Sequence, residues 1–178
     1  QNNLGRTGQS IHVKHEGSIL NEIEISDKNK SGFALADFND NGFDDIVFGT
    51  DDNKLYLLLD NNIVATGFPF ESNAKFNLAP IIVSFLNQNI IIAPCKNKTV
   101  YAINQDGAVN FNIQFDQYIS TSPSAVEYGD HSLIFLGFNN GDIYGFDLYG
   151  NLNFSTNIGS KVIGTIVFSD LDSDGLPE

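Results

Sequence analysis

Four similar segments, spaced at nearly constant intervals, constrain the fold of this chain more than any other feature. Each opens with an apolar or aromatic residue, has a second apolar residue two positions later, and reaches Gly or Asn six positions on. They begin at Ile11, Tyr56, Tyr101 and Tyr144, in steps of 45, 45 and 43 residues. Apolar residues at every second position, followed by a Gly or Asn turn, predict a strand that enters a β-hairpin.

Each repeat contains three further segments that read as short strands. One follows the Gly or Asn turn, at 19–25, 63–65, 109–115 and 152–158. A second precedes the aromatic segment, at 45–49, 90–93 and 133–137, and is apolar enough to be buried on both faces. A third lies before that one, at 33–37, 81–85, 125–128 and 164–169. No stretch of the chain shows helical periodicity.

Four short strands in each unit of about 44 residues predict an all-β chain, a β-propeller built of four-stranded antiparallel blades. A lone four-stranded sheet cannot bury both of its faces, whereas stacked sheets can, and 15 Phe residues suit that packing. The alternative is a stacked β-solenoid, whose coils are usually shorter. We expect one propeller region over 1–178, divided into the end of one blade at 1–30, blades at 31–75, 76–118 and 119–160, and the start of another at 161–178.

The phase of the repeat leads us to expect an incomplete or trimmed propeller. The chain opens on the last two strands of one unit and stops just after the first strand of another. It contains no Met, which points to a processed or excised form. Other blades, or another chain, would then be needed to close the ring.

Charge excludes two classes of partner. The chain has 22 acidic and 9 basic residues, with a formal net charge of −13. Nucleic acids and anionic membrane surfaces both need a basic face. No apolar run is long enough for a transmembrane helix, so we expect no membrane insertion. The single cysteine, Cys95, cannot form an internal disulfide and is expected to be a small buried side chain.

Two loops have the spacing of a metal-binding sequence. Residues 37–45 (DFNDNGFDD) and 170–178 (DLDSDGLPE) both fit D-x-[DN]-x-[DN]-G-x-x-[DE], and they lie 133 residues apart, which is three repeat steps. Oxygen side chains at positions 1, 3 and 5 can converge on one hard cation, the glycine at position 6 permits a sharp turn, and position 7 offers a carbonyl. A carboxylate at position 9 closes the shell. The candidate ligands are Asp37, Asn39, Asn41, Phe43 (carbonyl) and Asp45 in the first loop, and Asp170, Asp172, Asp174, Leu176 (carbonyl) and Glu178 in the second.

Calcium is the cofactor that these donors favour, because all are oxygens in a flexible loop, whereas Mg²⁺ demands stricter octahedral geometry. The loops are not EF-hands, since position 12 of the first is Phe48, inside a predicted strand. The alternative is an Asp/Asn/Gly-rich hairpin turn without metal. We expect weaker binding at the first loop, where Asn replaces two Asp residues, and none in the two middle repeats, which lack the loop.

The run from Ala34 to Thr50, followed by Leu55 and Tyr56, resembles the FG-GAP/VCBS-type repeats of calcium-loop β-propellers, the class that includes integrin α-subunit propellers. The resemblance covers 34–62 and 164–178, while the middle repeats look more like quinoprotein-type propeller repeats. It implies calcium binding and an extracellular, cell-surface or periplasmic location. It also implies, more broadly, a role in binding or adhesion or as a scaffold beside other domains. Our leading interpretation is a non-catalytic role, with a protein or glycan as partner.

Catalytic patterns are weak, so we expect no catalytic and no cofactor-binding residues. His12, His15 and His131 form no recognisable zinc set, and the acidic pairs Glu127–Asp130 and Asp142–Asp147 read as exposed turn residues. Exposed tyrosines, among them Tyr118 and Tyr149, are candidates for stacking on sugars. The leading hypothesis is a calcium-binding module of a secreted or cell-surface bacterial protein. The alternatives are the propeller part of a polysaccharide-degrading enzyme, or a periplasmic assembly scaffold.

Overall fold

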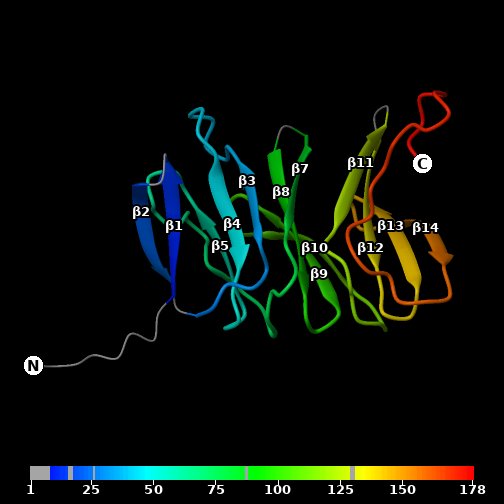
Figure 1. Ribbon diagram of the computed structural model, residues 1–178, viewed down its shortest axis with the longest axis horizontal. Helices are drawn as coiled ribbons and strands as arrows, with labels where there is room; N and C mark the ends of the chain where they lie inside the picture. Colours follow the sequence, from blue (N-terminus) through cyan, green and yellow to red (C-terminus); the bar gives the residue numbers. More distant parts are fainter. Residues whose placement is uncertain (1–8, 16–17, 26, 87, 129–130) are drawn as a thin grey trace, which may run out of the picture.

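A computed structural model describes residues 9–15, 18–25, 27–86, 88–128 and 131–178, and its regular structure consists of β-strands (Figure 1). A two-stranded antiparallel sheet contains β1 (Gln9–His15) and β2 (Ser18–Ile25). Three four-stranded antiparallel sheets follow. The first contains β3 (Phe33–Ala36), β4 (Asp45–Gly49), β5 (Lys54–Leu58) and β6 (Phe70–Glu71). The second contains β7 (Ile81–Phe85), β8 (Gln88–Cys95), β9 (Thr99–Asn104) and β10 (Val109–Gln114). The third contains β11 (Ser124–Tyr128), β12 (His131–Gly137), β13 (Asp142–Asp147) and β14 (Leu152–Asn157).

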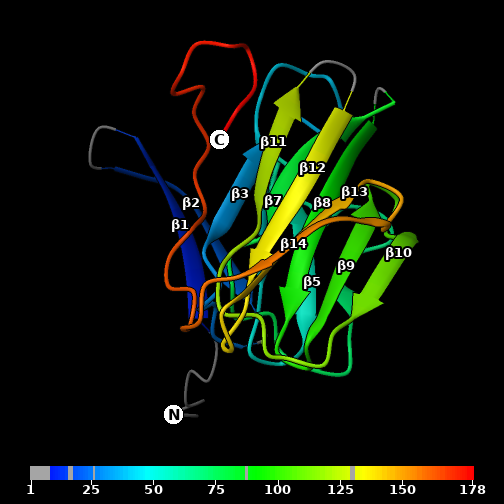
Figure 2. The same cartoon turned by 90° about the vertical axis from the view of Figure 1, so that its right-hand side faces the viewer.

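Within each four-stranded sheet, consecutive strands are neighbours, so the chain runs up and down as a meander. The sheets follow one another across the molecule in sequence order (Figures 1 and 2). The first strand of each sheet runs toward the top of Figure 1, which we call the upper end. Loop 37–45 and the C-terminal loop 170–178 lie at the upper end, and the β4–β5, β8–β9 and β12–β13 turns lie at the opposite, lower end.

The apolar core lies between the sheets, and β8 shows how it is built. Neighbouring residues of a strand point to opposite faces. Ile91 packs in one cluster with Val47 of the first sheet, whereas Ile92 packs in another with Ile134 of the third, and all four side chains are fully buried. Burial on both faces therefore explains the continuous apolar run at 90–93, as the sequence predicted. Cys95 is also buried, as predicted.

The first and second sheets approach closely at two glycines. Gly67 and Gly107 have φ values of 87° and 81°, which favour glycine. A Cβ on Gly67 would lie 1.9 Å from the carbonyl oxygen of Asp106, and one on Gly107 would lie 2.3 Å from that of Gly67. The turns of the neighbouring sheets can touch here only because both positions are glycine.

The predicted strand at 63–65 is wrong. Val64 forms only an isolated bridge to Leu58, flanked by backbone hydrogen bonds of 2.9 Å from Leu59 to Ile63 and from Ala65 to Leu57. The fourth strand of the sheet is β6, which pairs with Lys54 and Leu55. The chain makes a second turn first, closed by a hydrogen bond of 3.0 Å from the Phe68 N–H to the Ala65 carbonyl. This second turn contains Gly67, so the fourth strand of the sheet begins only at Phe70.

The predicted strand at 164–169 is also not formed. A strand requires a ladder of partners, and no described residue pairs with 164–168; Ser169 bonds only to Glu178 across its own loop. The segment instead runs along the outward face of the third sheet, where the hydroxyl of Ser124 donates a hydrogen bond of 2.6 Å to the carbonyl of Ile166.

A search of the described residues finds no helix long and apolar enough to cross a membrane.

Candidate functional site

The two predicted metal loops are each closed by backbone pairing between the residue before the loop and the last residue of the loop. Loop 37–45 joins β3 to β4, and Ala36 pairs with Asp45 at its base. In the C-terminal loop, Ser169 and Glu178 exchange two backbone hydrogen bonds, of 3.2 and 3.0 Å. Each loop therefore starts one residue before its first Asp and ends on its last carboxylate.

Inside the first loop, the carboxylate of Asp37 gathers backbone N–H groups. Its Oδ1 accepts hydrogen bonds of 3.2 Å from both Asn39 and Asn41, and its Oδ2 accepts one of 2.7 Å from Gly42. Hydrogen bonds to the charged form, above all the one from Gly42, lower the pKa of Asp37 below its ordinary value of 3.8. The carboxylate is therefore ionised at neutral pH.

The second loop repeats this arrangement around Asp170. Its Oδ1 accepts from the N–H of Asp174 at 3.1 Å, and its Oδ2 accepts from Gly175 at 2.9 Å. Position 3 accepts from position 5 in both loops, since Asn39 and Asp172 each receive a hydrogen bond of 3.2 Å.

Further along, position 5 accepts from position 7 in both loops. Phe43 donates to Asn41 at 2.9 Å, and Leu176 donates to Asp174 at 2.8 Å. The backbone conformations agree as well, because positions 4 and 6 have positive φ in both loops. The values are 56° at Asp40 and 90° at Gly42 in the first loop, and 65° at Ser173 and 86° at Gly175 in the second.

Position 9 binds back to position 2 in both loops. Asp45 accepts a hydrogen bond of 2.9 Å from the N–H of Phe38, and Glu178 accepts one of 2.8 Å from Leu171. Asp45 is fully buried and accepts a second hydrogen bond, of 2.8 Å, from the N–H of Asp60. The position-9 carboxylate thus fastens the loop even without a cation.

The donor set fits a hard cation best in the second loop. One carboxylate oxygen from each of Asp170, Asp172 and Asp174 lies within 4.8 Å of the others, and all three residues are exposed. Calcium–oxygen distances of about 2.3–2.6 Å allow ligands on opposite sides of one ion to be this far apart. In the first loop, Asn41 Oδ1 already accepts a hydrogen bond from the Phe43 N–H, while its Nδ2 donates to Asp60 Oδ1 at 3.0 Å. Metal binding by either loop stays a prediction.

Beside the first loop lies a polar pocket of about 530 Å³ that sequence reasoning missed. Asp37, Asp40, Ser84 and Gln105 line it, together with Phe38, Leu86 and Asn89. The Asn89 side chain donates a hydrogen bond of 3.0 Å from Nδ2 to the carbonyl of Asp37, and so ties the second sheet to the loop of the first. These residues are far apart in sequence, and no pattern in it marks them as neighbours.

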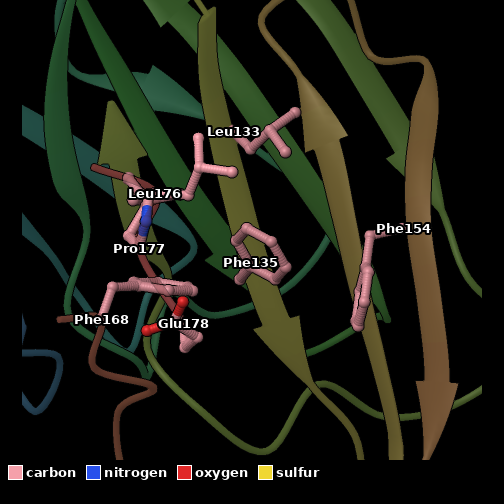
Figure 3. A pocket seen from close by; sticks show the side chains of 8 residues that line it. Leu133, Phe135, Phe154, Phe168, Leu176, Pro177 and Glu178 are labelled. Atoms are coloured by element: carbon pink, nitrogen blue, oxygen red, sulfur yellow. The ribbon is translucent and has the colours of Figure 1, made fainter. Parts of the chain in front are cut away.

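The outward face of the third sheet carries an apolar groove of about 500 Å³ (Figure 3). Its walls are Val126, Leu133, Phe135, Phe154, Phe168, Leu176, Pro177 and Glu178. The rings of Phe135 and Phe168 lie 4.8 Å apart, so the C-terminal segment already covers part of this face. Phe154 stays 43% exposed. The sequence predicted the apolar strand β12 but gave no sign that Phe168 packs onto it.

The other candidate residues fall into separate places. Asp142 and Asp147 lie at opposite ends of β13 and do not form a pair. Hydrogen bonds from Asn157 and Asn140 lower the pKa of Asp142, while Asp147 closes the β13–β14 turn. The side chains of His12, His15 and His131, and all of Asp130, lie outside the described residues.

Comparisons with known proteins identify the fold. No family model matches the sequence, and no curated protein matches it. Among solved structures, the chain is similar to BamB from Moraxella catarrhalis, with a TM-score of 0.68 and 15% identity over 83% of this chain and 43% of that one. It is also similar to BBS1N in a crystal structure with ARL6DN, with a TM-score of 0.66 and 14% identity over 86% of this chain and 48% of that one.

The chain therefore spans less than half the length of each of these structures. Both are β-propellers made of four-stranded antiparallel sheets, and identities this low establish the fold alone. The fold class predicted from the sequence is confirmed: the chain is all-β and has the architecture of part of a β-propeller.

Proposed function

We propose that this chain is a non-catalytic β-propeller module that binds calcium in two loops and a protein partner at its upper end. The observation that carries the proposal is that the two loops share one hydrogen-bond pattern. Five side-chain-to-backbone hydrogen bonds recur at the same positions, 133 residues apart. An ordinary acidic turn has no reason to recur so completely.

Calcium would be held by Asp37, Asn39, Asn41 and Asp45 with the Phe43 carbonyl, and by Asp170, Asp172, Asp174 and Glu178 with the Leu176 carbonyl. The ion supplies positive charge that neutralises the clustered carboxylates. The protein contributes a loop already shaped by its own N–H groups, so little ordering is required on binding. Extracellular modules bind calcium at about 10⁻⁴–10⁻³ M, and a tenfold excess over such a Kd adds about 1.4 kcal/mol of stability per site.

A protein partner is favoured by apolar side chains exposed at the upper end. Phe43 of the first metal loop is 66% exposed, Leu86 of the β7–β8 turn is 75% exposed, and Tyr149 of the β13–β14 turn is 68% exposed. Large apolar side chains raised on loops are typical anchors of protein interfaces. The solved BBS1N structure, a complex with ARL6DN, supports protein binding by a chain of this fold. A secreted, cell-surface or periplasmic location is part of the proposal, because millimolar calcium is found there.

The division into blades belongs to the same proposal. We assign blades to 31–75, 76–118 and 119–160, and parts of two further blades to 1–30 and 161–178. The face of the second sheet that carries Ile92 and Ala102 packs against the third sheet. The corresponding face of the third sheet, with Phe135 and Phe154, is apolar and partly exposed, which favours another sheet there, from further blades or a second chain.

Calorimetry with calcium on chelator-stripped protein tests the metal sites. We expect two sites and a raised Tm in the wild type. One site should remain in Asp172→Asn/Asp174→Asn, which removes two ligand charges. Asp40→Asn is the matched control, since Asp40 belongs to the first loop but occupies none of its ligand positions. Absence of binding at millimolar calcium, or unchanged binding in the double variant, contradicts the proposed sites.

Protein and glycan arrays test the partner class. The chain is applied once in calcium and once in chelator. We expect a signal on the protein array that depends on calcium and weakens in Phe43→Ser/Leu86→Ser. A signal on the glycan array alone, or one that the double variant retains in full, contradicts a protein partner at the upper end.

A further inference from the structure

The basic side chains of this acidic protein gather at one end. Every lysine whose side chain the structure describes lies at the lower end: Lys28, Lys30, Lys54, Lys75, Lys96, Lys98 and Lys161. Among residues with described side chains, the upper end carries no lysine or arginine, and it holds both metal loops. The lower end also carries acidic residues, among them Asp27, Asp51, Asp52 and Asp142, so its potential is less negative than that of the upper end without being strongly positive.

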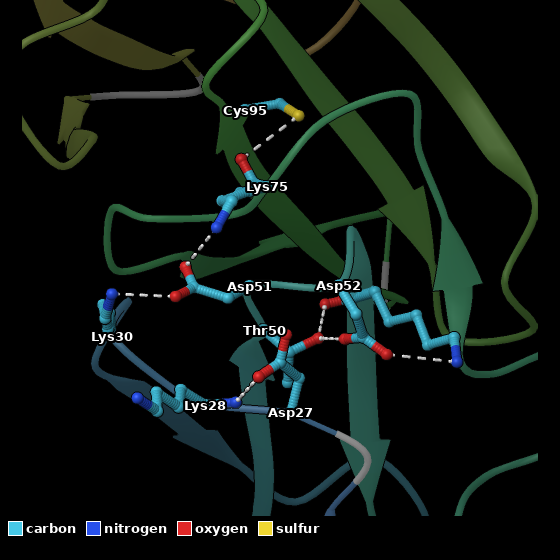
Figure 4. Close-up of polar contacts among 9 residues, drawn as sticks. Asp27, Lys28, Lys30, Thr50, Asp51, Asp52, Lys75 and Cys95 are labelled. Atoms are coloured by element: carbon cyan, nitrogen blue, oxygen red, sulfur yellow. Dashed lines mark hydrogen bonds and ion pairs between the residues drawn. The ribbon is translucent and has the colours of Figure 1, made fainter.

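Three of these lysines are neutralised by nearby carboxylates (Figure 4). Asp51 binds Lys30 at 2.8 Å and Lys75 at 3.5 Å, and Asp52 binds Lys54 at 3.2 Å. These lysines have their counter-charges within the fold and are poor candidates for holding a ligand.

Lys96 and Lys161 are different. Both line a pocket of about 340 Å³ between the second and third sheets, and neither side chain forms a hydrogen bond or ion pair with any described residue. Two amides in the same pocket, Asn77 and Asn139, likewise have no side-chain partner among the described residues. The remaining lining residues are Leu78, Cys95, Tyr118, Ile119 and Ser120, so no acidic residue lines this pocket.

An aromatic ring is fixed in the wall of the pocket. Tyr118 is 52% exposed, and the Lys98 ammonium lies 4.8 Å from the centroid of its ring. Lys98 is itself anchored, because its Nζ donates a hydrogen bond of 2.8 Å to the carbonyl of Asp116. The Ser120 hydroxyl donates to the carbonyl of Val162 at 2.8 Å and ties the segment before β11 to the segment after β14. The pocket is therefore built before any ligand arrives.

We propose that this pocket binds a small organic acid with a hydroxylated body, the chemistry of a sugar acid. Two ammonium groups with no carboxylate partner meet the acid group, and side-chain amides can both donate to and accept from neighbouring hydroxyls. The tyrosine ring offers an apolar face for the sugar body. The volume suits a small molecule rather than a bare ion. A phosphate site would favour arginine, and no arginine is among the described residues that line this pocket.

The proposal is independent of calcium and is tested with D-glucuronate as the probe. Backbone amide resonances of the full 178-residue chain are followed by NMR during titration, with chelator present. We expect saturable shifts at Lys96, Ser120 and Asn139 that weaken at high salt, and much smaller shifts with D-glucose. In Lys96→Gln/Lys161→Gln the affinity should fall at least about tenfold, since both counter-charges are lost. Lys28→Gln, at the same end but outside the pocket, is the matched control and should bind as the wild type does.

Three outcomes overturn the proposal. They are no saturable shift with glucuronate, equal shifts with glucose, and unchanged affinity in the double variant. Inorganic phosphate forms a further arm, and shifts with phosphate but not with glucuronate would replace the sugar acid by a simple anion. The unperturbed spectrum of the double variant away from the pocket verifies that it is folded.

Discussion

The buried carboxylate of Asp45 accepts a hydrogen bond of 2.8 Å from the backbone N–H of Asp60, across the turn that follows β5. The other oxygen of the same carboxylate accepts from Phe38. One side chain therefore joins the first metal loop to the neighbouring turn, and it does so whether or not a cation is bound. Its role in stability can be separated from its predicted role as a ligand.

Replacement of Asp45 by alanine should lower the free energy of unfolding by about 2–4 kcal/mol, because two backbone N–H groups lose their acceptor. Denaturant unfolding in chelator measures this without any contribution from calcium. Asp44→Ala is the control, since Asp44 is exposed and should change stability by less than about 0.5 kcal/mol. Equal effects of the two substitutions would show that the contacts of Asp45 contribute nothing.

Acid should weaken the first loop through Asp37. Its pKa is lowered in the folded state, chiefly by the Gly42 N–H, from an ordinary value of 3.8. The stabilisation is therefore complete above that value and is lost as the pH falls through the lower, folded-state pKa. In chelator, Asp37→Asn should be less stable than the wild type at about pH 6, and the difference should shrink toward about pH 2.5. The prediction is contradicted if the stability difference between Asp37→Asn and the wild type stays constant with pH, or if Asp40→Asn shows the same pH-dependent difference.

The two asparagines of the first loop should respond differently to added charge. Asn39→Asp supplies a carboxylate at a predicted ligand position and should tighten calcium binding roughly tenfold. Asn41→Asp should bring no such gain, because Asn41 Nδ2 donates to Asp60, and a carboxylate there would face another. Calorimetry in the Asp172→Asn/Asp174→Asn background isolates this loop. Equal gains in both variants would mean that the contact to Asp60 does not persist in solution.

Gly67 should be the least replaceable glycine of the first sheet. In Gly67→Ala the new methyl group meets the Asp106 carbonyl at 1.9 Å, so unfolding should become easier by about 2–5 kcal/mol. Gly164→Ala separates the clash from the backbone strain, since Gly164 has a φ of 85° but no atom within 4 Å of the added carbon. There we expect about 1–2 kcal/mol. Matching losses at the two sites would exclude the close approach as the cause.

Sequence periodicity predicted the sheets because hairpins are local. Strands such as β8 and β9 are joined by a short turn, so their pairing is already implied by alternating apolar residues and a turn signal. The same holds for the hydrogen bonds inside each metal loop, which join residues at most seven positions apart. Spacing alone could therefore indicate which side chains come together.

What the sequence did not reveal depends on contacts between sheets. The segment 63–65 is apolar enough for a strand, but the meeting of Gly67 with Gly107 makes the chain turn first. The hydrogen bond from Asn89 to Asp37 joins the second sheet to the loop of the first, and Lys96 and Lys161 line the same pocket although they are far apart in sequence. No repeat pattern encodes such meetings, since they depend on how one sheet stacks on the next.

The gathering of the lysines at the lower end gives the molecule an electric dipole along its strands. This dipole determines the orientation in which the molecule binds to a charged surface. A positively charged sensor chip should attract the upper end and bury the metal loops, leaving the lysine-lined pocket free. Coupling through lysine amines should attach the molecule the other way up, with the loops facing the solution and the pocket against the support. A binding assay on immobilised protein therefore reports on one end or the other according to the coupling chemistry.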